Sequence, residues 1–436
     1  MSRAQELTEK IESGTVRCGV IGLGYVGLPL SCEFARSGMS VLGFDVDETK
    51  CARINRGESY VGDVSSEDLA AQVEEGRLTA TTDFSLLASV DTINICVPTP
   101  LRKTKDPDVS YIAAAVTEIA KHLRTGQLVI LESTTYPGTT DELILPRLES
   151  TGLRVAEDFF LAFSPERVDP GNARFHTRNI PKVVGGHSTT CTNVAQSLYR
   201  KTVDHVVPVS STRVAEMVKL HENTFRSVNI GLVNELALMC NEMGIDVWEV
   251  IEAAATKPFG FTPFYPGPGL GGHCIPIDPF YLSWKARQHG FEARFIELAG
   301  HVNTSMPHYV ATKVAEALNS RSQAVRGASV LIAGVAYKPN VDDSRESPAL
   351  DVIEQLTKWG ANVAYSDPMI PTYAAGSVEL ESVAFDGQEI AARDCIVVIT
   401  DHEAFDYTLL RSPDGPVVVD TRNALRGVRS PHLFRL

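Results

Sequence analysis

Short apolar runs alternate with stretches of helical periodicity over the first 166 residues of the chain. The apolar runs predict one strand that ends in Asp45 and others at 16–21, 91–100, 127–135 and 158–166. Helical periodicity follows the run at 16–21 and returns over 110–124. Strands that alternate with helices in this way are typical of a parallel sheet covered by helices, so the pattern predicts an α/β, doubly wound first domain.

The pattern changes after residue 210. Apolar residues then recur with a period of roughly 3.6 up to about residue 250, which predicts one long helix, and a second helical stretch covers 294–320. From residue 328 the α/β pattern returns, with strands, a glycine turn and a helix before Asp367. We therefore expect two Rossmann-like doubly wound domains joined by a central helical domain, with boundaries at 1–208, 209–320 and 321–436.

Composition and charge narrow the class of protein. The chain has 436 residues, 44% of them hydrophobic and 22% charged, which predicts a globular protein of two or three domains. A net charge of −14 argues against a broad basic face for nucleic acid. There is no apolar run long enough for a membrane span and no apolar segment typical of a secretion signal, and the eight cysteines show no metal-like pairing. We expect a reduced, cytoplasmic setting, no membrane and no metal site.

The first predicted strand runs into the motif Gly22-x-Gly24-x-x-Gly27, and an acid, Asp45, ends the next strand. In a dinucleotide-binding turn the first glycine allows the tight turn, the second lets the backbone approach the pyrophosphate, and the third packs helix on strand. The acid accepts hydrogen bonds from ribose hydroxyls and repels a 2′-phosphate. The motif therefore predicts NAD rather than NADP, with a purely structural βαβ unit as the alternative.

Polar residues end several of the predicted strands, at the edge where ligands bind in open α/β sheets. Thr99, Thr134 and Glu166 do so in the first domain, although each could be only a turn former. In the last domain Lys338, Arg345 and Arg422 stand near strand ends or in the loops that follow. These cations are what an anionic nucleotide requires in an acidic protein.

The segment "PGPGLGGHCIPIDP" (266–279) places Cys274 between glycines and prolines. Glycines permit close backbone approach and prolines stiffen the flanks, so the loop is suited to hold a thiol in one place. A tight turn with a buried cysteine is the structural alternative. Pairing with His273, as in a cysteine protease, is disfavoured because adjacent side chains rarely reach the same point.

Lys219 and Asn223 lie four residues apart in the predicted long helix and therefore share one of its faces. A solvated lysine is the usual interpretation of such a position. The same helix could also form a dimer seam, although its apolar pattern is not a clean heptad.

Taken in order, the motifs GLGYVGLPL, VPTP, STT-x-PGT, SPE, K-L-x-x-N, GGHC-x-x-x-D and AYKP-x-x-DD-x-RESP resemble the UDP-glucose/GDP-mannose dehydrogenase family. The resemblance covers residues 16–425, and the cysteine loop is most similar to the bacterial UDP-N-acetylglucosamine 6-dehydrogenase branch. The UDP-glucose branch usually has Ser at the position of His273 and Lys at that of Ile277. These departures argue against glucose and against a cofactor-contacting lysine at 277.

The resemblance implies oxidation of a sugar C6 alcohol to a carboxylate with two NAD molecules, in surface polysaccharide or lipopolysaccharide precursor synthesis. The Cys274 thiolate, its pKa lowered by Lys219 or loop N–H groups, would add to the aldehyde and then form a thioester that water hydrolyses. Lys219 and Asn223 would stabilise oxyanions, and Lys219 would also take the hydroxyl proton. Asp278 would orient Lys219 or a water, unless it is a structural cap. Glu166, helped by Thr134, would activate the hydrolytic water.

The resemblance also implies two sets of binding residues. Those for NAD are Gly22, Gly24, Tyr25, Val26, Gly27, Asp45, Lys50, Thr99, Thr134 and Arg345. Those for the UDP-sugar are residues 162–166, Arg167, Lys219, Asn223, the 263–267 loop with Tyr265, Gly271, Lys338 and Arg422. UDP-N-acetylglucosamine is the preferred substrate, and UDP-ManNAc, UDP-GalNAc, UDP-glucose and a non-catalytic nucleotide-sugar sensor are the alternatives. A homodimer or higher homo-oligomer built on the central helix is expected.

Overall fold

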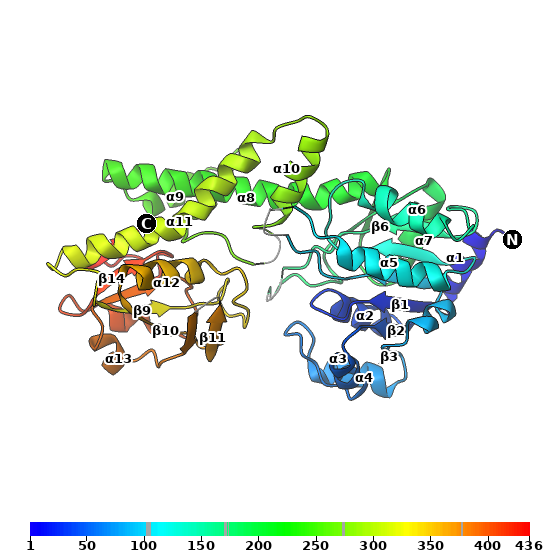
Figure 1. The fold of residues 1–436 in the computed structure, drawn as a ribbon, viewed down its shortest axis with the longest axis horizontal. Helices are drawn as coiled ribbons and strands as arrows, with labels where there is room; N and C mark the ends of the chain where they lie inside the picture. The colour runs from blue at the N-terminus through cyan, green and yellow to red at the C-terminus, as the bar shows by residue number, and fades with distance from the viewer. Residues whose placement is uncertain (102–105, 170–171, 173, 273–274, 376–377) are drawn as a thin grey trace. The chain divides into compact units, whose positions relative to one another are not determined.

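The computed structural model describes residues 1–101, 106–169, 172, 174–272, 275–375 and 378–436 (Figure 1). The chain forms two compact units. The first comprises Met1–Glu222 and Trp284–His289, and the second comprises Asn223–Ser283 and Gly290–Leu436. Two helices, α8 (Thr212–Met243) and α10 (Asp278–Gln288), contribute residues to both units. The three boundaries expected from the sequence remain a prediction.

An eight-stranded sheet forms the centre of the first unit, in the order β3-β2-β1-β4-β5-β6-β7-β8. Neighbouring strands are parallel except β6 and β7, which are antiparallel. The chain order reverses between β1 and β4, and ligands bind at such a point in open α/β sheets. The strands are β1 (Arg17–Ile21), β2 (Ser40–Phe44), β3 (Leu78–Thr81), β4 (Thr92–Ile95), β5 (Leu128–Leu131), β6 (Phe160–Phe163), β7 (Lys182–Gly186) and β8 (Val206–Val209).

Both faces of this sheet are buried. Along β5, Leu128 and Ile130 join one apolar cluster and Val129 and Leu131 join another, because successive side chains of a strand point to opposite faces. Helices cover each face, which explains why the central strands β4, β5 and β6 are buried at every position. The helical segments of the first unit are α1 (Arg3–Ser13), α2 (Gly27–Arg36), α3 (Glu48–Asn55), α4 (Ser66–Glu74), η1 (Phe84–Ser89), α5 (Ser110–His122), η2 (Thr140–Ile144), α6 (Leu145–Glu149) and α7 (Thr189–Arg200).

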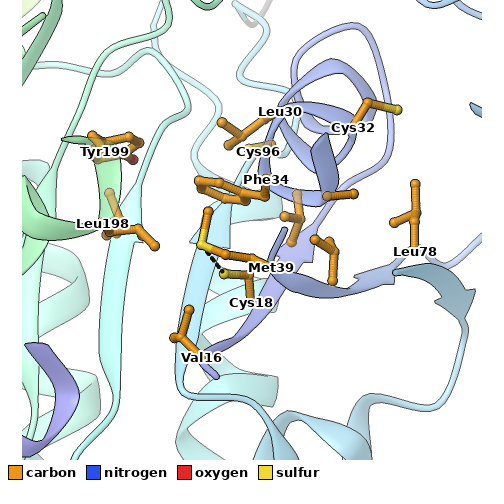
Figure 2. Close-up of a cluster of buried hydrophobic side chains, with 14 of the residues drawn as sticks. Val16, Cys18, Leu30, Cys32, Phe34, Met39, Leu78, Cys96, Leu198 and Tyr199 are labelled. Atoms are coloured by element: carbon orange, nitrogen blue, oxygen red, sulfur yellow. Dashed lines mark hydrogen bonds between the residues drawn. The ribbon is translucent and has the colours of Figure 1, made fainter. Parts of the chain in front are cut away.

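Figure 2 shows part of the cluster on one face of the sheet, where Phe34 of α2 lies near Tyr199 of α7. Cys18 and Met39 meet there with their sulfur atoms 3.8 Å apart. Cys18, Cys96 and Cys395 are buried, as their apolar sequence surroundings predict. Burial raises the pKa of the Cys18 thiol to about 12, so this cysteine behaves as a small hydrophobic side chain.

The N-terminal helix α1 was not expected from the sequence, because its residues are mostly polar. Ser2 begins it with a capping box in which its side chain and that of Gln5 each accept a backbone N–H, and Gly14 ends it at a φ of 74°. Leu7 and Ile11, one turn apart, are its buried residues, and α1 packs on α7.

In the second unit a five-stranded parallel sheet has the order β10-β9-β13-β14-β15. Apart from the small hairpin of β11 and β12, this is the doubly wound order 2-1-3-4-5. Along β9 the side chains again alternate, with Val330 and Ile332 in one apolar cluster and Leu331 and Ala333 in another. The strands and helical segments are β9 (Ser329–Ala333), α12 (Pro348–Trp359), β10 (Asn362–Ser366), β11 (Thr372–Ala375), β12 (Val378–Glu381), α13 (Gly387–Ala391), β13 (Cys395–Val398), η3 (Tyr407–Leu410), β14 (Val417–Asp420) and β15 (Leu433–Arg435). The fold is thus α/β, with two Rossmann-like sheets and a helical region between them in the chain.

The helical region differs from the expected continuous helix over 210–250. Gly244 takes a φ of 67° and ends α8, and the Asp246 side chain accepts backbone N–H groups to begin α9 (Val247–Ala255). The second predicted helix is α11 (Arg294–Asn319), which packs against α12 and β14. In the described part of the chain, none of the helices has the length and apolar character needed to cross a membrane.

Candidate active site

The turn after β1 has the geometry that the three-glycine motif predicts. Gly22 has a φ of 88°, and a Cβ on it would lie 2.5 Å from the carbonyl oxygen of Cys96. A Cβ on Gly27 would lie 1.8 Å from the carbonyl oxygen of Gly22, whereas a Cβ on Gly24 would meet nothing within 4 Å. Gly22 and Gly27 are therefore required by the fold, and Gly24 keeps the outer surface of the turn clear for a ligand.

The N-terminus of α2 follows this turn directly. Val26 is its N-cap residue and makes no side-chain capping bond, and the Leu28 N–H donates to the carbonyl oxygen of Gly24 at 3.1 Å. A helix N-terminus without a side-chain cap favours an anion through its N–H groups and its dipole. This arrangement fits the pyrophosphate of a dinucleotide.

Asp45 directly follows β2 and is nearly buried. Its Oδ2 accepts the Leu23 N–H at 2.8 Å and its Oδ1 accepts the Asp47 N–H at 3.0 Å. Lys50 Nζ lies 3.8 Å from Asp45 Oδ2. A carboxylate has about four acceptor positions, so room remains for ribose hydroxyls. Together with Gly24 and the start of α2, this residue makes the turn fit NAD.

Thr99 and Thr134 follow β4 and β5, which are parallel neighbours in the sheet, so both lie at the carboxyl edge. The Ser133 hydroxyl donates to the carbonyl oxygen of Val97 at 2.8 Å and ties the two segments together. Thr134 is half-buried. Arg345 belongs to the second unit, where its guanidinium forms a two-pronged pair with Asp343 at 2.9 and 2.7 Å.

Glu166, which follows β6, has both carboxylate oxygens engaged. Its Oε1 accepts the N–H groups of Arg167 and Val168 at 2.7 and 2.8 Å, and its Oε2 accepts Lys182 Nζ at 3.0 Å. Burial by itself would raise the pKa of Glu166, but the Lys182 charge and these hydrogen bonds outweigh burial and lower it. Glu166 is held as an anion.

Sequence reasoning missed the residues behind Glu166. Lys182 Nζ also donates to Glu132 Oε2 at 2.7 Å, and Glu132 Oε1 accepts the Asn94 amide at 3.0 Å and the Tyr199 hydroxyl. Glu132 lies within the apolar run at 127–135, and Lys182 belongs to none of the sequence motifs. The one available signal was a charged residue inside a buried strand end.

Arg167 and Lys219 belong to the first unit. The Arg167 guanidinium pairs with Glu222 of α8, with its Nη2 2.6 Å from Oε1, and donates to the Pro181 carbonyl oxygen at 2.6 Å. Lys219 is 8% exposed on the same helix, so it is not the solvated lysine of the structural interpretation.

A hollow of about 470 Å³ lies within the first unit. Tyr25 and Val26 of the glycine turn line it, and so does Glu166. Further lining residues come from α2 and α4 and from the segment after β6, among them Arg36, Asp68, His176 and Arg178. The hollow therefore joins part of the predicted cofactor turn to the carboxylate predicted to act on water.

In the second unit, the Asn223 side-chain amide donates a hydrogen bond to Asp278 Oδ2. Asp278 is 2% exposed and begins α10. The pair brings together the K-L-x-x-N helix and the end of the cysteine-loop motif, which are 55 residues apart in the sequence. Cys274 and His273 lie outside the described residues.

The loop that leads to the cysteine is fixed by close contacts. The Gly267 N–H donates to Asn234 Oδ1 at 2.9 Å, and a Cβ on Gly267 would lie 2.6 Å from Arg422 Nη1. A Cβ on Gly271 would lie 2.8 Å from Tyr337 Cβ. Gly267 thus lies against Arg422 after β14, and Gly271 lies against Tyr337 in the segment after β9 that also contains Lys338. These segments follow the carboxyl ends of neighbouring parts of the second sheet.

Tyr265 is 49% exposed and stacks on Trp248 of α9, with ring centroids 6.0 Å apart. The Trp248 ring is buried, so it supplies a fixed support for the tyrosine. No sequence pattern links these two residues, because only the packing of α9 against the loop brings them together.

Three comparisons with known proteins agree on one family. Models of the UDP-glucose/GDP-mannose dehydrogenase family match residues 16–203 (NAD binding domain), 213–305 (central domain) and 331–427 (UDP binding domain). A UDP-N-acetyl-D-glucosamine 6-dehydrogenase from Pseudomonas aeruginosa is 38% identical over 81% of this chain and 83% of its own length. An NDP-N-acetyl-D-galactosaminuronic acid dehydrogenase from Ralstonia nicotianae is 35% identical over 92% and 95%.

A solved structure, that of UDP-D-ManNAc dehydrogenase from Pyrococcus horikoshii, is similar over nearly the whole chain. Its TM-score is 0.87 and its sequence is 34% identical, with 96% of this chain and 98% of that chain covered.

Proposed function

Because this chain belongs to the UDP-glucose/GDP-mannose dehydrogenase family and is an NAD-dependent UDP-sugar dehydrogenase, we propose that its substrate is UDP-N-acetylglucosamine and its product the C6 uronic acid. The cysteine-loop motif, similar to that of the N-acetylglucosamine branch, and the Pseudomonas aeruginosa relative both support this sugar. Relatives named for ManNAc and GalNAcA substrates leave the epimer as the point to test.

The observation that carries the proposed mechanism is the Asn223–Asp278 hydrogen bond. It fixes the start of α10, four residues after Cys274, against the helix that carries Lys219 and Asn223. In the proposed reaction Lys219 takes the proton of the C6 hydroxyl, and Lys219 and Asn223 stabilise the oxyanions that develop. Because Asn223 is held by Asp278, its amide is oriented before substrate binds.

NAD supplies the chemistry of hydride acceptance when it is bound, once for each oxidation step. Gly22, Gly24, Gly27 and the start of α2 hold its pyrophosphate, and Asp45 accepts its ribose hydroxyls. Tyr25, Val26, Lys50, Thr99, Thr134 and Arg345 are the further proposed contacts.

Cys274 carries the second half of the reaction. Its thiolate adds to the C6 carbonyl of the aldehyde, and the resulting oxyanion takes a proton to give a thiohemiacetal. Loss of a second hydride from that carbon, together with the proton of its hydroxyl, leaves a thioester, and water then hydrolyses the thioester to the carboxylic acid and the thiol. Glu166 and Thr134 orient this water, while Arg167, Tyr265, Gly271, Lys338 and Arg422 hold the UDP-sugar.

The test is a comparison of purified protein with UDP-GlcNAc, UDP-ManNAc, UDP-GalNAc and UDP-glucose, measuring NADH formed per sugar consumed. The highest kcat/KM with UDP-GlcNAc and two NADH per sugar are expected. A higher value with another sugar changes the substrate, and no NADH with any of them favours the nucleotide-sugar sensor. Cys274→Ala should still bind NAD yet form no acid, and acid formation at the wild-type rate would contradict the thioester route.

A further inference from the structure

A buried lysine in the first unit lies between two carboxylates. Lys182 Nζ is 2.7 Å from Glu132 Oε2 and 3.0 Å from Glu166 Oε2, and the side chain is 4% exposed. Burial opposes the charge of Lys182, but the two carboxylates outweigh burial and raise the pKa of Lys182. Lys182 is therefore a fixed cation within the fold.

The two carboxylates differ in what surrounds them. Glu132 is fully buried, burial raises its pKa despite Lys182, and it also accepts the hydroxyl of Tyr199, whose ring packs in the apolar cluster of Figure 2. Glu166 lines the 470 Å³ hollow, whereas Glu132 and Lys182 are not among its lining residues. Lys182 thus connects a carboxylate inside the core with one at the surface of a cavity.

Burying these three charges costs desolvation free energy, and packing does not require charged side chains at these positions. Burying an ion pair is often no better for stability than burying apolar side chains of the same volume. A methionine at 182 would have a similar volume but would leave Glu132 and Glu166 without their shared cation. The buried charge is explained if Lys182 keeps Glu166 ionised and in one orientation.

Other charged and titratable groups also face this network. Cys96 at the end of β4 interacts electrostatically with all three charged members. The groups around Glu166 are Lys182, Glu132, Cys96 and Tyr199 on the core side, Arg167 with its partner Glu222 beside it, and Asp63, Asp169, His176 and Arg178 along the hollow.

We propose that Lys182 is a positioning residue that holds Glu166 ionised and in one orientation at the wall of the hollow. The inference rests on the proposed function, in which Glu166 acts on the water that hydrolyses the thioester. With Oε1 occupied by two N–H groups and one position of Oε2 by Lys182, the remaining lone pair of Oε2 is the acceptor left for a water.

The first test measures the pH dependence of kcat/KM with the UDP-sugar that the wild type oxidises. Lys182→Met removes the cation and should move the acid limb to higher pH, because Glu166 then protonates more readily. Lys182→Arg keeps the charge and should restore the wild-type limb. The matched control is Lys121→Met, whose lysine forms an exposed ion pair with Glu118 on α5, and its limb should not move.

A double-mutant comparison separates positioning from general damage. Glu166→Gln should lower kcat/KM at neutral pH by roughly 10²-fold, the usual effect of removing a group that assists proton transfer, and should abolish the limb. Adding Lys182→Met to Glu166→Gln should then leave the pH profile unchanged. The proposal would be overturned if the double variant shows a further shift of the pH profile, or if Lys182→Met leaves the acidic side of the profile where it is in the wild type.

A measurement without substrate keeps this inference separate from the proposed function. A carboxyl whose folded pKa is lowered stabilises the protein above its unfolded pKa of about 4.3 and loses that contribution as the pH falls. The difference in unfolding free energy between wild type and Glu166→Gln should therefore grow as the pH rises from below the folded pKa of Glu166 to above about 4.3. In the Lys182→Met background that growth should disappear, and its persistence there would refute the role of Lys182 even if no UDP-sugar is oxidised.

Discussion

Asp45 and Asp367 occupy equivalent positions in the two sheets. Asp45 Oδ2 accepts the Leu23 N–H after β1 at 2.8 Å, and Asp367 Oδ2 accepts the Val335 N–H after β9 at the same distance. Each aspartate follows the strand that lies beside the first strand of its sheet, so the same hydrogen bond from turn to aspartate occurs in both sheets.

The two carboxylates differ in what else they bind. Asp367 is a buried acceptor for four backbone N–H groups and for His402 Nε2 at 3.0 Å. The His402 Nδ1 accepts the Asn340 N–H, so Nε2 carries the proton in the neutral ring. Asp367 therefore has little capacity left for ribose hydroxyls, whereas Asp45 keeps free acceptor positions. Only the first sheet has a dinucleotide turn among the residues that the structure describes.

Asp45→Asn should weaken NAD binding by about ten-fold, because a hydrogen bond to a charged acceptor contributes about 1.5–3 kcal/mol. The same change should narrow the preference for NAD over NADP, since the carboxylate no longer repels a 2′-phosphate. Isothermal titration with both cofactors measures the two effects. Asp47→Asn, at the neighbouring N-cap of α3, is the control and should leave the ratio unchanged. If the ratio of NAD to NADP affinity is unchanged in Asp45→Asn, Asp45 does not contact the ribose.

Alanine at Gly24 and at Gly27 should have opposite effects. Gly27→Ala places a Cβ 1.8 Å from the Gly22 carbonyl oxygen and should lower stability by about 1–3 kcal/mol or more. Gly24→Ala meets only open space, so its unfolding free energy should stay within about 0.5 kcal/mol of wild type while NAD binding weakens. Thermal unfolding and cofactor titration of both variants distinguish the two roles. Equal losses of stability would contradict the assignment of Gly24 to the ligand side.

Glu216 should make stability fall as the pH rises between its two pKa values. Burial raises its pKa from 4.5 to about 7, despite hydrogen bonds from the N–H groups of Gly138 and Thr140. The folded state binds more protons than the unfolded state in this window, so the loss is about 3 kcal/mol at about 1.4 kcal/mol per pH unit. Denaturant unfolding from pH 4.5 to 7 measures the slope.

Glu216→Gln should remove that pH-dependent contribution, and Glu75→Gln, which changes an exposed acid paired with Arg77, should not. If wild type and Glu216→Gln show the same slope, Glu216 is ionised throughout the range.

Lys285 should anchor the end of α10 within the first unit. Its Nζ donates to Glu142 Oε2 at 2.7 Å and lies 5.0 Å from the centre of the Tyr136 ring, while Trp284 packs on the same tyrosine. Lys285→Met should lower the unfolding free energy by about 1 kcal/mol, the usual worth of one hydrogen-bonded contact. Pairing Lys285→Glu with Glu142→Lys should recover part of the loss seen in either change alone, and additive losses would show that the two side chains do not interact.

Much of the fold could be predicted from local sequence. The glycine turn and Asp45 could be predicted because they act within one βαβ unit, and the strands could be recognised because burial on both faces makes the central ones largely apolar. The break at Gly244 was missed, since apolar residues continue at helical spacing on both sides of it. The polar α1 was missed because its buried face is only Leu7 and Ile11.

The sequence by itself determined the cofactor turn, the two α/β regions and the family, because each depends on residues that are close together in the chain or on motifs in a fixed order. Tertiary structure alone decided that Lys182 stands between Glu132 and Glu166, 50 and 16 residues away, and that Tyr199 reaches Glu132 across 67 residues. The order of the strands sets these meetings, and the reversal between β6 and β7 places Lys182 where it is. A charge buried this deeply is tolerated only because oppositely charged partners lie beside it, and no local sequence pattern identifies those partners.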